Sequence, residues 1–382
     1  MSVVGYNSPW MDEELTLLRQ SVRRFIKEEF VPGQARWRAQ HGPDAEAWSS
    51  IGKAGILLQD IPEEYGGGGG TFAHETVLNE ELAYAGVHFG SNIQAIVAHY
   101  ILTYGTEKQK RAWLPRMARG ELIAAIAMTE PSAGSDLAAV KTAALRRGDH
   151  FVLTGSKTFI TNGALANLVC VAVKTDPAAP GLKGLSLLMV ETQGARGYHT
   201  GKPLDKVGMN GLDTCEMFFD EVCVPAGNLL GEEGKGFSQM VQQLPYERLS
   251  IGTVAVASAE QALAITTKYV KERKAFGKPL LEFQNTRFKL AQCNTEVHIG
   301  RVFLDHCIQL QLAGRLDAVT AAMAKYWLTE CQCRVIDECV QLHGGYGYMI
   351  EYPIAQMWTD SRVQRIYAGT NEIMKELIGW AL

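Results

Sequence analysis

The 382-residue sequence has eight cysteines but no pair spaced C-x-x-C. They lie singly within apolar segments, at Cys170, Cys215, Cys223, Cys293, Cys307, Cys331, Cys333 and Cys339. Structural zinc sites use paired ligands at short spacing, and disulfide frameworks are typical of much smaller secreted domains. We therefore expect no metal site and no disulfide framework, but free buried thiols in a reducing compartment.

The sequence also lacks the signals of membrane insertion and of polyanion binding. No apolar run approaches the roughly 20 residues that cross a bilayer, and no basic region followed by an apolar core opens the chain. We expect a soluble cytoplasmic protein without a membrane span, or a mitochondrial matrix protein if a transit peptide has been removed. The formal net charge of -4 gives no general attraction to nucleic acid, although the basic cluster from Lys271 to Lys274 can still meet a phosphate.

Two glycine motifs for nucleotide binding are missing as well. The run from Gly66 to Gly70 is not followed by Lys-Ser or Lys-Thr and has no strand and helix around it, so it predicts a mobile turn. There is no Rossmann fingerprint. Any dinucleotide must therefore bind through loop amides, hydroxyl groups and helix surfaces.

The periodicity of the apolar residues divides the chain into three parts. Helical spacing covers 12–25, where Pro32 and Gly33 are expected to stop the helix, and continues over 48–55, 72–104 and 107–117. Short apolar or alternating segments follow at 122–128, 151–154, 168–174, 185–191 and 215–224. They are separated by turn residues rather than by helices of crossover length, which favours antiparallel pairing. Helical spacing returns over 237–276, 282–313 and 316–342 and again from Asn371.

The resulting fold prediction is a multidomain α+β protein. Residues 1–121 form an N-terminal all-α domain, residues 122–234 a middle antiparallel β domain, and residues 235–382 a C-terminal four-helix bundle.

Two loops rich in hydroxyl groups lie in the middle part. Residues 128–136 read Met-Thr-Glu-Pro-Ser-Ala-Gly-Ser-Asp, and residues 157–163 read Lys-Thr-Phe-Ile-Thr-Asn-Gly. Ser132 or Ser135 in isolation is equally well explained as a turn cap. Together, two strand-end loops of this kind are able to frame the polar edge of a flat heterocycle.

A single carboxylate stands out in the third part, where residues 244–249 read Leu-Pro-Tyr-Glu-Arg-Leu. Pro245 suits the first turn of a helix. Its position alone therefore explains Glu247 as a side chain that interacts favourably with a helix macrodipole.

Five segments in this order resemble the flavin-dependent acyl-CoA dehydrogenase family over nearly the whole chain. They are the 128–136 loop, Phe-Ile-Thr-Asn-Gly at 159–163, Arg-Lys-Ala-Phe-Gly-Lys-Pro-Leu at 273–280, Gln-Leu-His-Gly-Gly-Tyr-Gly at 341–347 and Ile-Tyr-Ala-Gly-Thr-Asn-Glu-Ile at 366–373. The C-terminal half is most similar to the long-chain branch, followed by the isovaleryl-CoA branch.

The resemblance implies non-covalent FAD, an acyl-CoA substrate, electron-transfer flavoprotein as a partner and a homotetramer. The implied cofactor residues are Ile126, Met128, Thr129, Ser135, Phe159, Thr161, Arg273, Phe276, Gln284, Gln341, Gly344, Gly345, Thr370 and Glu372, of which Arg273, Phe276, Gln284 and the 341–345 segment would serve the FAD of a neighbouring subunit. The implied substrate contacts are Ser135, Tyr246, Arg248, Ala368 and Gly369, with residues 92–102 near the end of the acyl pocket. Ser135 and Tyr246 are as well explained by a turn cap and a packed aromatic, and His343 is given no catalytic role.

The family reaction removes an α-proton from the thioester and transfers a hydride from the β carbon to flavin N5, giving a trans-2-enoyl-CoA. Many members carry the base in a Tyr-Glu-Gly-Thr motif, but this chain has Ala368 at that position. The long-chain and isovaleryl branches instead carry it in a Glu-Arg-Leu motif, which matches 247–249. The resemblance therefore implies that Glu247 is the base and that the backbone N–H of Ala368 polarises the thioester.

Two alternatives stay open. An oxygen-using relative, either an acyl-CoA oxidase or a flavin monooxygenase, would share the motifs, although the short chain counts against the oxidase. A flavin-free helical scaffold is an alternative of another class.

Overall fold

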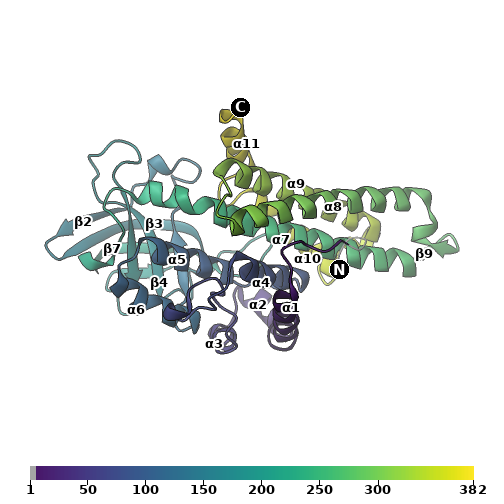
Figure 1. The fold of residues 1–382 in the computed structure, drawn as a ribbon, viewed down its shortest axis with the longest axis horizontal. Coiled ribbons are helices and arrows are strands. Elements are labelled where there is room, and N and C mark those ends of the chain that lie inside the picture. Colours follow the sequence, from purple (N-terminus) through teal and green to yellow (C-terminus); the bar gives the residue numbers. More distant parts are fainter. Residues whose placement is uncertain (1–5) are drawn as a thin grey trace.

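Helices make up the N-terminal third of the computed structural model, which describes residues 6–382 (Figure 1). They are α1 (Glu13–Phe25), α2 (Gln34–Gln40), α3 (Ala45–Lys53), α4 (Phe72–Tyr84), α5 (Ser91–Tyr104) and α6 (Glu107–Ala118). Asp12 caps α1 by accepting a hydrogen bond from the Leu15 amide, and capping boxes begin α4 at Thr71 and α6 at Thr106.

The prediction that the first helical segment stops at Pro32 and Gly33 is wrong. A π turn (Ile26–Phe30) and a 3-10 turn (Val31–Gly33) continue from α1 into α2. Proline is tolerated there because it stands in the first turn of the 3-10 segment, where its missing N–H leaves no hydrogen bond unmade.

An eight-stranded sheet forms the middle of the chain. Its strands are β1 (Ala124–Ala127), β2 (Ala143–Arg147), β3 (His150–Thr161), β4 (Leu168–Lys174), β5 (Leu185–Glu191), β6 (Tyr198–Thr200), β7 (Thr214–Pro225) and β8 (Leu229–Leu230). The order is β6-β7-β3-β2-β4-β5-β8, with β1 beside β4. Most pairs are antiparallel as predicted, but β1 and β2 pair with β4 in parallel. The crossover between these strands is made by β3 and its flanking loops rather than by a helix.

Three long helices dominate the C-terminal part: α7 (Gly236–Glu272), α8 (Gln284–Leu312) and α9 (Ala318–His343). The hairpin of β9 (Lys274–Ala275) and β10 (Lys278–Pro279) joins α7 to α8. The terminal helical segment predicted from Asn371 is confirmed as α11 (Asn371–Trp380), although it is short rather than long. The α10 helix (Pro353–Ser361), which was not predicted, precedes it, and both pack on α9.

The α7 helix passes a length and composition test for a membrane span. However, 72% of its most apolar window is buried inside the protein, so the apolar surface is already covered by other elements. Such burial is typical of the core helix of a folded domain.

One hydrophobic core joins the three parts of the chain. It includes Trp48 and Tyr100 from the N-terminal helices, Leu187 from the sheet and Leu249 from α7. A buried ion-pair cluster also joins the N-terminal helices to the C-terminal ones, because Arg301 on α8 contacts Glu80 on α4 as well as Glu260 on α7. These contacts fix the N-terminal helices against α7.

The glycine run is held by hydrogen bonds rather than forming the mobile turn that was predicted. All five amides from Gly66 to Gly70 donate to carbonyl oxygens of residues 58–63. A Cβ at Gly67 would lie 2.2 Å from the Ile61 carbonyl oxygen, so this close approach needs glycine. With these amides already used, the run cannot cradle a phosphate.

The eight cysteines are free, as expected. Six are buried and Cys333 is half-buried, but Cys223 is exposed, so the prediction of buried thiols is wrong for Cys223.

Candidate active site

Glu247 lies in the interior of α7, not at its start. The helix begins at Gly236, so the prediction that Pro245 occupies the first turn is wrong. A macrodipole acts mainly on charges within the first turn, so it does not explain a carboxylate this far along the helix.

Glu247 is almost completely shielded from solvent. Its side chain is only 7% exposed, and the Tyr100 hydroxyl of α5 donates a hydrogen bond of 2.9 Å to its Oε1 atom. Burial raises the pKa of Glu247 from 4.5 to about 7, while the Tyr100 hydrogen bond and the Arg248 charge oppose this rise. A carboxyl with a pKa near neutrality is suited to general base catalysis, because it is both available and basic at working pH.

Arg248 is buried beside the loop that carries Ala368. Its Nη2 atom would lie 3.9 Å from a Cβ placed at Gly369. Burial lowers the pKa of its guanidinium, and its Nε has no hydrogen-bond partner within residues 6–382. This guanidinium is therefore a buried donor that a ligand at the loop can use.

The loop itself is held in a strained shape. Ala368 has a φ of 52° and Gly369 a φ of 88°, so two successive residues take the left-handed conformation. The ammonium of Lys325, which is fully buried on α9, donates to the Gly369 carbonyl at 2.8 Å and to Asn371 Oδ1 at 2.9 Å. The loop is thus tied to the helical bundle through its carbonyl group, and the half-buried Ala368 presents its backbone near Arg248.

The hydroxyl-rich loops of the middle domain are fixed to each other by a buried ion pair. Lys157 Nζ lies 2.8 Å from Glu130 Oε1 and 3.1 Å from the Met128 carbonyl oxygen, and the Thr158 amide donates to the Thr129 carbonyl. Burial lowers the pKa of Lys157 to about 8. The two loops are therefore in direct contact in the structure, so both lie beside the same site.

The side chains predicted at the flavin in this region are accessible. Ile126, Met128, Thr129 and Thr161 are half-buried, whereas Phe159 is 67% exposed with a φ of 60°. Ser135 is exposed, and the turn that follows it is capped by Asp136, which accepts from the Ala138 amide. The turn-cap explanation of Ser135 is thus not supported.

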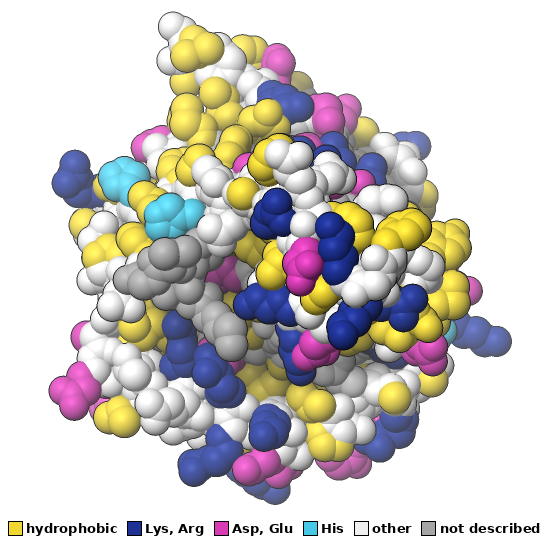
Figure 2. Space-filling view, turned by 90° about the vertical axis from the view of Figure 1, so that its right-hand side faces the viewer, with side chains coloured by type: hydrophobic (Ala, Val, Ile, Leu, Met, Phe, Trp, Pro, Cys, Tyr) yellow, Lys and Arg dark blue, Asp and Glu magenta, His cyan; other side chains and the backbone are white. Residues whose placement is uncertain are grey.

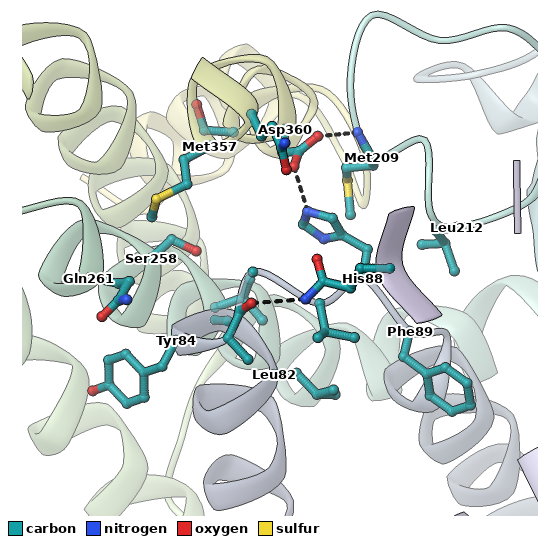
Figure 3. Close-up of a pocket in the computed structure, with 18 of the residues that line it drawn as sticks. Leu82, Tyr84, His88, Phe89, Met209, Leu212, Ser258, Gln261, Met357 and Asp360 are labelled. Carbon is teal, nitrogen blue, oxygen red and sulfur yellow. Dashed lines mark hydrogen bonds and ion pairs between the residues drawn. The ribbon is translucent and has the colours of Figure 1, made fainter. Parts of the chain in front are cut away.

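A cavity of about 520 Å³ opens where the three parts of the chain meet (Figure 3). Figure 3 shows His88 and Phe89 from the α4–α5 loop, Met209 and Leu212 from the middle domain, Ser258 and Gln261 from α7, and Met357 and Asp360 from α10 around it. Asp360 of α10 links the C-terminal helices to the N-terminal helices and the middle domain, because it accepts hydrogen bonds from Arg38, His88 and the Met209 amide. These contacts close one wall of the cavity.

The cavity relates to the candidate site in two ways. Thr161 and Tyr367, the neighbour of Ala368, both line it. Val254 and Ser258 lie on its α7 wall at seven and eleven positions after Glu247, which places them on the same helix face. Glu247 itself does not line the cavity, and of residues 92–102 only Asn92 and Ile93 do.

A second cavity of about 590 Å³ lies at the C-terminal end of α7. It gathers four of the predicted cofactor residues, Arg273, Gln341, Gly344 and Gly345. The β9–β10 hairpin beside it places Phe276 at its tip, 96% exposed and with a φ of 52°. Figure 2 views this end of the molecule and shows lysine and arginine side chains gathered among hydrophobic ones.

Several other predicted residues have identifiable structural contacts. Tyr246 is buried and donates to Asp60 at 3.0 Å, which favours the packed-aromatic explanation. The Thr370 hydroxyl caps α11 by accepting from the Ile373 amide, Glu372 is exposed in the first turn of α11, and Gln284 is exposed at the start of α8. His343 stacks on Tyr269 and its Nδ1 contacts the Cys339 carbonyl, so it is a packed histidine.

Sequence analysis missed Tyr100 and Lys325. Each lies in the interior of a long helix, and its partner is distant in the chain, 147 residues for Tyr100 and 44 for the Gly369 contact of Lys325. No local signal in the sequence marks either contact.

Comparison with known proteins places the whole chain in one family. Family models match residues 12–121 (acyl-CoA dehydrogenase, N-terminal domain), 125–222 (middle domain) and 234–382 (C-terminal domain). The chain is 48% identical to the mitochondrial long-chain specific acyl-CoA dehydrogenase of Mus musculus over 96% of its length and 85% of that protein. It is 34% identical to isovaleryl-CoA dehydrogenase of Pongo abelii over 97% of its length and 89% of that protein.

Solved structures agree with this placement. An acyl-CoA dehydrogenase from Geobacillus kaustophilus has a TM-score of 0.95 and 45% identity, covering 98% of this chain and 99% of that one. A glutaryl-CoA dehydrogenase from Mycobacterium smegmatis in complex with FADH2 has a TM-score of 0.90 and 28% identity over 97% of this chain and 95% of that one. The protein belongs to the acyl-CoA dehydrogenase family of FAD-dependent oxidoreductases.

The residues present fit a dinucleotide. A Cβ at Gly344 or Gly345 would meet no atom within 4 Å, so the backbone there is open to a ligand. The exposed guanidinium of Arg273 lies 5.5 Å from the centre of the Tyr346 ring, free to face a diphosphate.

Proposed function

We propose that this protein oxidises the Cα–Cβ bond of an acyl-CoA thioester, with Glu247 as the base that removes the α-proton. The observation that carries the proposal is the buried position of Glu247, which raises its carboxyl pKa to about 7. Ala368 stands where many relatives have a carboxylate and cannot accept a proton. A buried carboxylate of raised pKa on α7 supplies the base that the Ala368 loop lacks.

The loop at Ala368 would stabilise the negative charge that develops on the thioester oxygen. Its backbone N–H needs a fixed direction to do so, and Lys325 holds the adjacent carbonyl of Gly369. The buried guanidinium of Arg248, whose Nε has no hydrogen-bond partner among the described residues, adds a positive charge beside the same loop. Both cations are therefore placed to favour an enolate over a neutral thioester.

FAD, when bound, would supply the hydride acceptor. The side chains of Thr129 and Thr161 would orient its ring, and Arg273 with the backbone of Gly344 and Gly345 would hold its diphosphate and adenosine. The α-proton goes to Glu247, and the two electrons leave the β carbon with the hydride, so the products are an enoyl-CoA and a protonated carboxyl.

The two sets of cofactor residues lie far apart in one chain. Figure 1 shows β9, next to Arg273, at the end of the long helices farthest from β3, which carries Thr161. One FAD cannot meet both sets within a single chain, which supports an oligomer in which a neighbouring subunit completes each site. We propose the homotetramer that the family resemblance implies as this oligomer. We further propose that electron-transfer flavoprotein reoxidises the enzyme, in the cytoplasm or a mitochondrial matrix.

The base assignment is tested by Glu247→Gln, which keeps the shape of the side chain and removes its basicity. The variant should retain FAD and lose rapid flavin bleaching with acyl-CoA under anaerobic conditions. Glu233→Gln, at an exposed carboxylate before α7, should bleach at the wild-type rate. Wild-type bleaching by Glu247→Gln would refute the role of Glu247.

The same assay with straight and branched acyl-CoAs of increasing length reports the substrate preference. Release of hydrogen peroxide at a rate matching turnover would favour an oxygen-using relative over an enzyme that depends on electron-transfer flavoprotein. A purified protein without flavin absorption would favour the scaffold alternative.

The cofactor assignment is tested by Arg273→Gln. Loss of charge-assisted contacts to a diphosphate should weaken FAD binding about tenfold or more, measured as FAD released on dialysis. Lys268→Gln, one turn earlier on α7, should leave FAD retention unchanged. Equal retention by both variants would contradict the proposed diphosphate site.

A further inference from the structure

Tyr100 makes the one side-chain hydrogen bond that Glu247 receives within residues 6–382. Its hydroxyl lies 2.9 Å from Oε1, and both side chains are buried, with Tyr100 at 0% exposure. The second carboxylate oxygen, Oε2, has no side-chain donor among the same residues. A carboxylate held by one oxygen keeps the other oxygen free to accept a proton, and its direction is fixed.

A second contact fixes the helix that carries Tyr100. The neighbouring residue His99 has its Nε2 2.8 Å from Asp60 Oδ2, and Tyr246, the neighbour of Glu247, donates to the same oxygen at 3.0 Å. The rings of His99 and Tyr246 lie 4.3 Å apart. Two successive residues of α5 therefore meet two successive residues of α7, and Tyr100 cannot move away from Glu247 without breaking the contacts of its neighbour.

Other titratable groups around Glu247 do not replace this hydrogen bond. The groups that face it are Tyr100 and Tyr104 from α5, Cys170 from β4, and Tyr246 and Arg248 from α7 itself. Burial raises the pKa of Cys170 to about 12 and those of the three tyrosines as well, so these groups stay neutral at working pH. The Tyr104 hydroxyl instead lies within hydrogen-bond distance of the Gln239 carbonyl oxygen and of Gln242 Oε1, to either of which it can donate its one proton.

We propose that Tyr100 is the positioning residue of the catalytic base: its hydroxyl holds Oε1 of Glu247, aims Oε2 at the substrate and stabilises the ionised form. The inference rests on the role proposed above for Glu247. Because a hydrogen bond to a buried charge favours the charged form, removing the hydroxyl raises the carboxyl pKa and frees the side chain to turn.

The test is Tyr100→Phe, with Tyr104→Phe as its control on the same helix face one turn later. Tyr100→Phe should move the acidic limb of the kcat/KM profile up by about one pH unit, and lower kcat/KM at pH 6 about tenfold. Tyr104→Phe should leave the limb where it is. A limb that stays in place in Tyr100→Phe overturns the proposal, because loss of packing alone would lower stability without moving a pKa.

A second variant should shift the acidic limb of the kcat/KM profile in the opposite direction. Replacing Tyr100 with 3-fluorotyrosine gives a more acidic hydroxyl and a stronger donor, so the acidic limb should move down. An infrared titration of the FAD-containing protein, taken as the difference between wild type and Glu247→Gln, follows the carboxyl band of Glu247 without reference to activity. A band whose midpoint is unchanged in both Tyr100 variants contradicts the inference even if activity falls.

The outcomes separate this inference from the proposed function. Full activity in Glu247→Gln removes the base assignment and the inference together. An inactive Glu247→Gln with an unmoved limb in Tyr100→Phe removes only the role of Tyr100.

Discussion

The ammonium of Lys325 lies 2.8 Å from the carbonyl oxygen of Gly369, so helix α9 holds the loop that presents Ala368. The contact joins a fully buried lysine to two successive left-handed residues, a backbone shape that persists only when its surroundings enforce it.

Lys325→Met should therefore release this loop. The loss of a buried charged donor leaves the Gly369 carbonyl and the Asn371 side chain without a partner, which should cost about 1–3 kcal/mol of stability. We expect kcat to fall about tenfold with a smaller change in FAD retention. Lys375→Met, at an exposed lysine 4.8 Å from the Tyr326 ring centre, should change neither. Unchanged kcat in Lys325→Met would show that the loop does not need this contact.

Arg301 should contribute far more to stability than a surface arginine. Arg301→Leu removes the charge that Glu80 and Glu260 share, leaving Glu80 paired with Arg19 alone and Glu260 with only the Tyr84 hydroxyl, which should cost about 3–5 kcal/mol. Arg334→Leu breaks an exposed pair with Glu296 and should cost below about 1 kcal/mol. The measurement is the thermal unfolding midpoint of each variant. Similar midpoints would mean that the N-terminal helices do not depend on the buried cluster.

Gly67 should not tolerate a side chain. A methyl group there would lie 2.2 Å from the Ile61 carbonyl oxygen, so Gly67→Ala should destabilise the protein by on the order of 2–3 kcal/mol. Gly227→Ala, where a Cβ meets no atom within 4 Å, should be close to neutral. Chemical denaturation distinguishes the two, and a neutral Gly67→Ala would contradict the tight turn.

Glu247 should make the protein less stable as the pH rises. Its folded pKa of about 7 lies above the ordinary value of 4.5, so between these values the folded state binds more protons than the unfolded state. The stability from this group is fully present below about pH 4.5 and is lost as pH rises through 7, a change of about 3 kcal/mol.

Glu247→Gln removes this dependence. The melting temperature of the variant, measured relative to wild type, should rise between pH 5 and 8 and then level off. A constant difference over that range would show that the carboxyl is not held at a raised pKa.

Much of the fold follows from local patterns. The apolar spacing that predicts helices at 12–25 and 107–117 also appears in the structure as α1 and α6, because those helices bury the face that the pattern marks. The short elements α2, β2 and α10 were missed because they give too few residues for a periodic signal. The parallel pairing of β1 with β4 depends on residues that are more than 40 positions apart, which no window of sequence contains.

The features of the candidate site likewise fall into those that the sequence predicts and those that depend on the fold. The sequence by itself determined the family, and it placed Ala368 and Glu247 within the motifs on which the proposed base assignment rests, because both are residue identities within motifs. Only the tertiary structure decided that Glu247 is shielded from water, accepts a hydrogen bond from Tyr100 and has a carboxyl pKa of about 7. A pKa depends on the exclusion of water and on groups from distant segments of the chain. The tertiary structure also separated the two sets of residues proposed to bind the cofactor, because the length of α7 holds Arg273 away from the sheet.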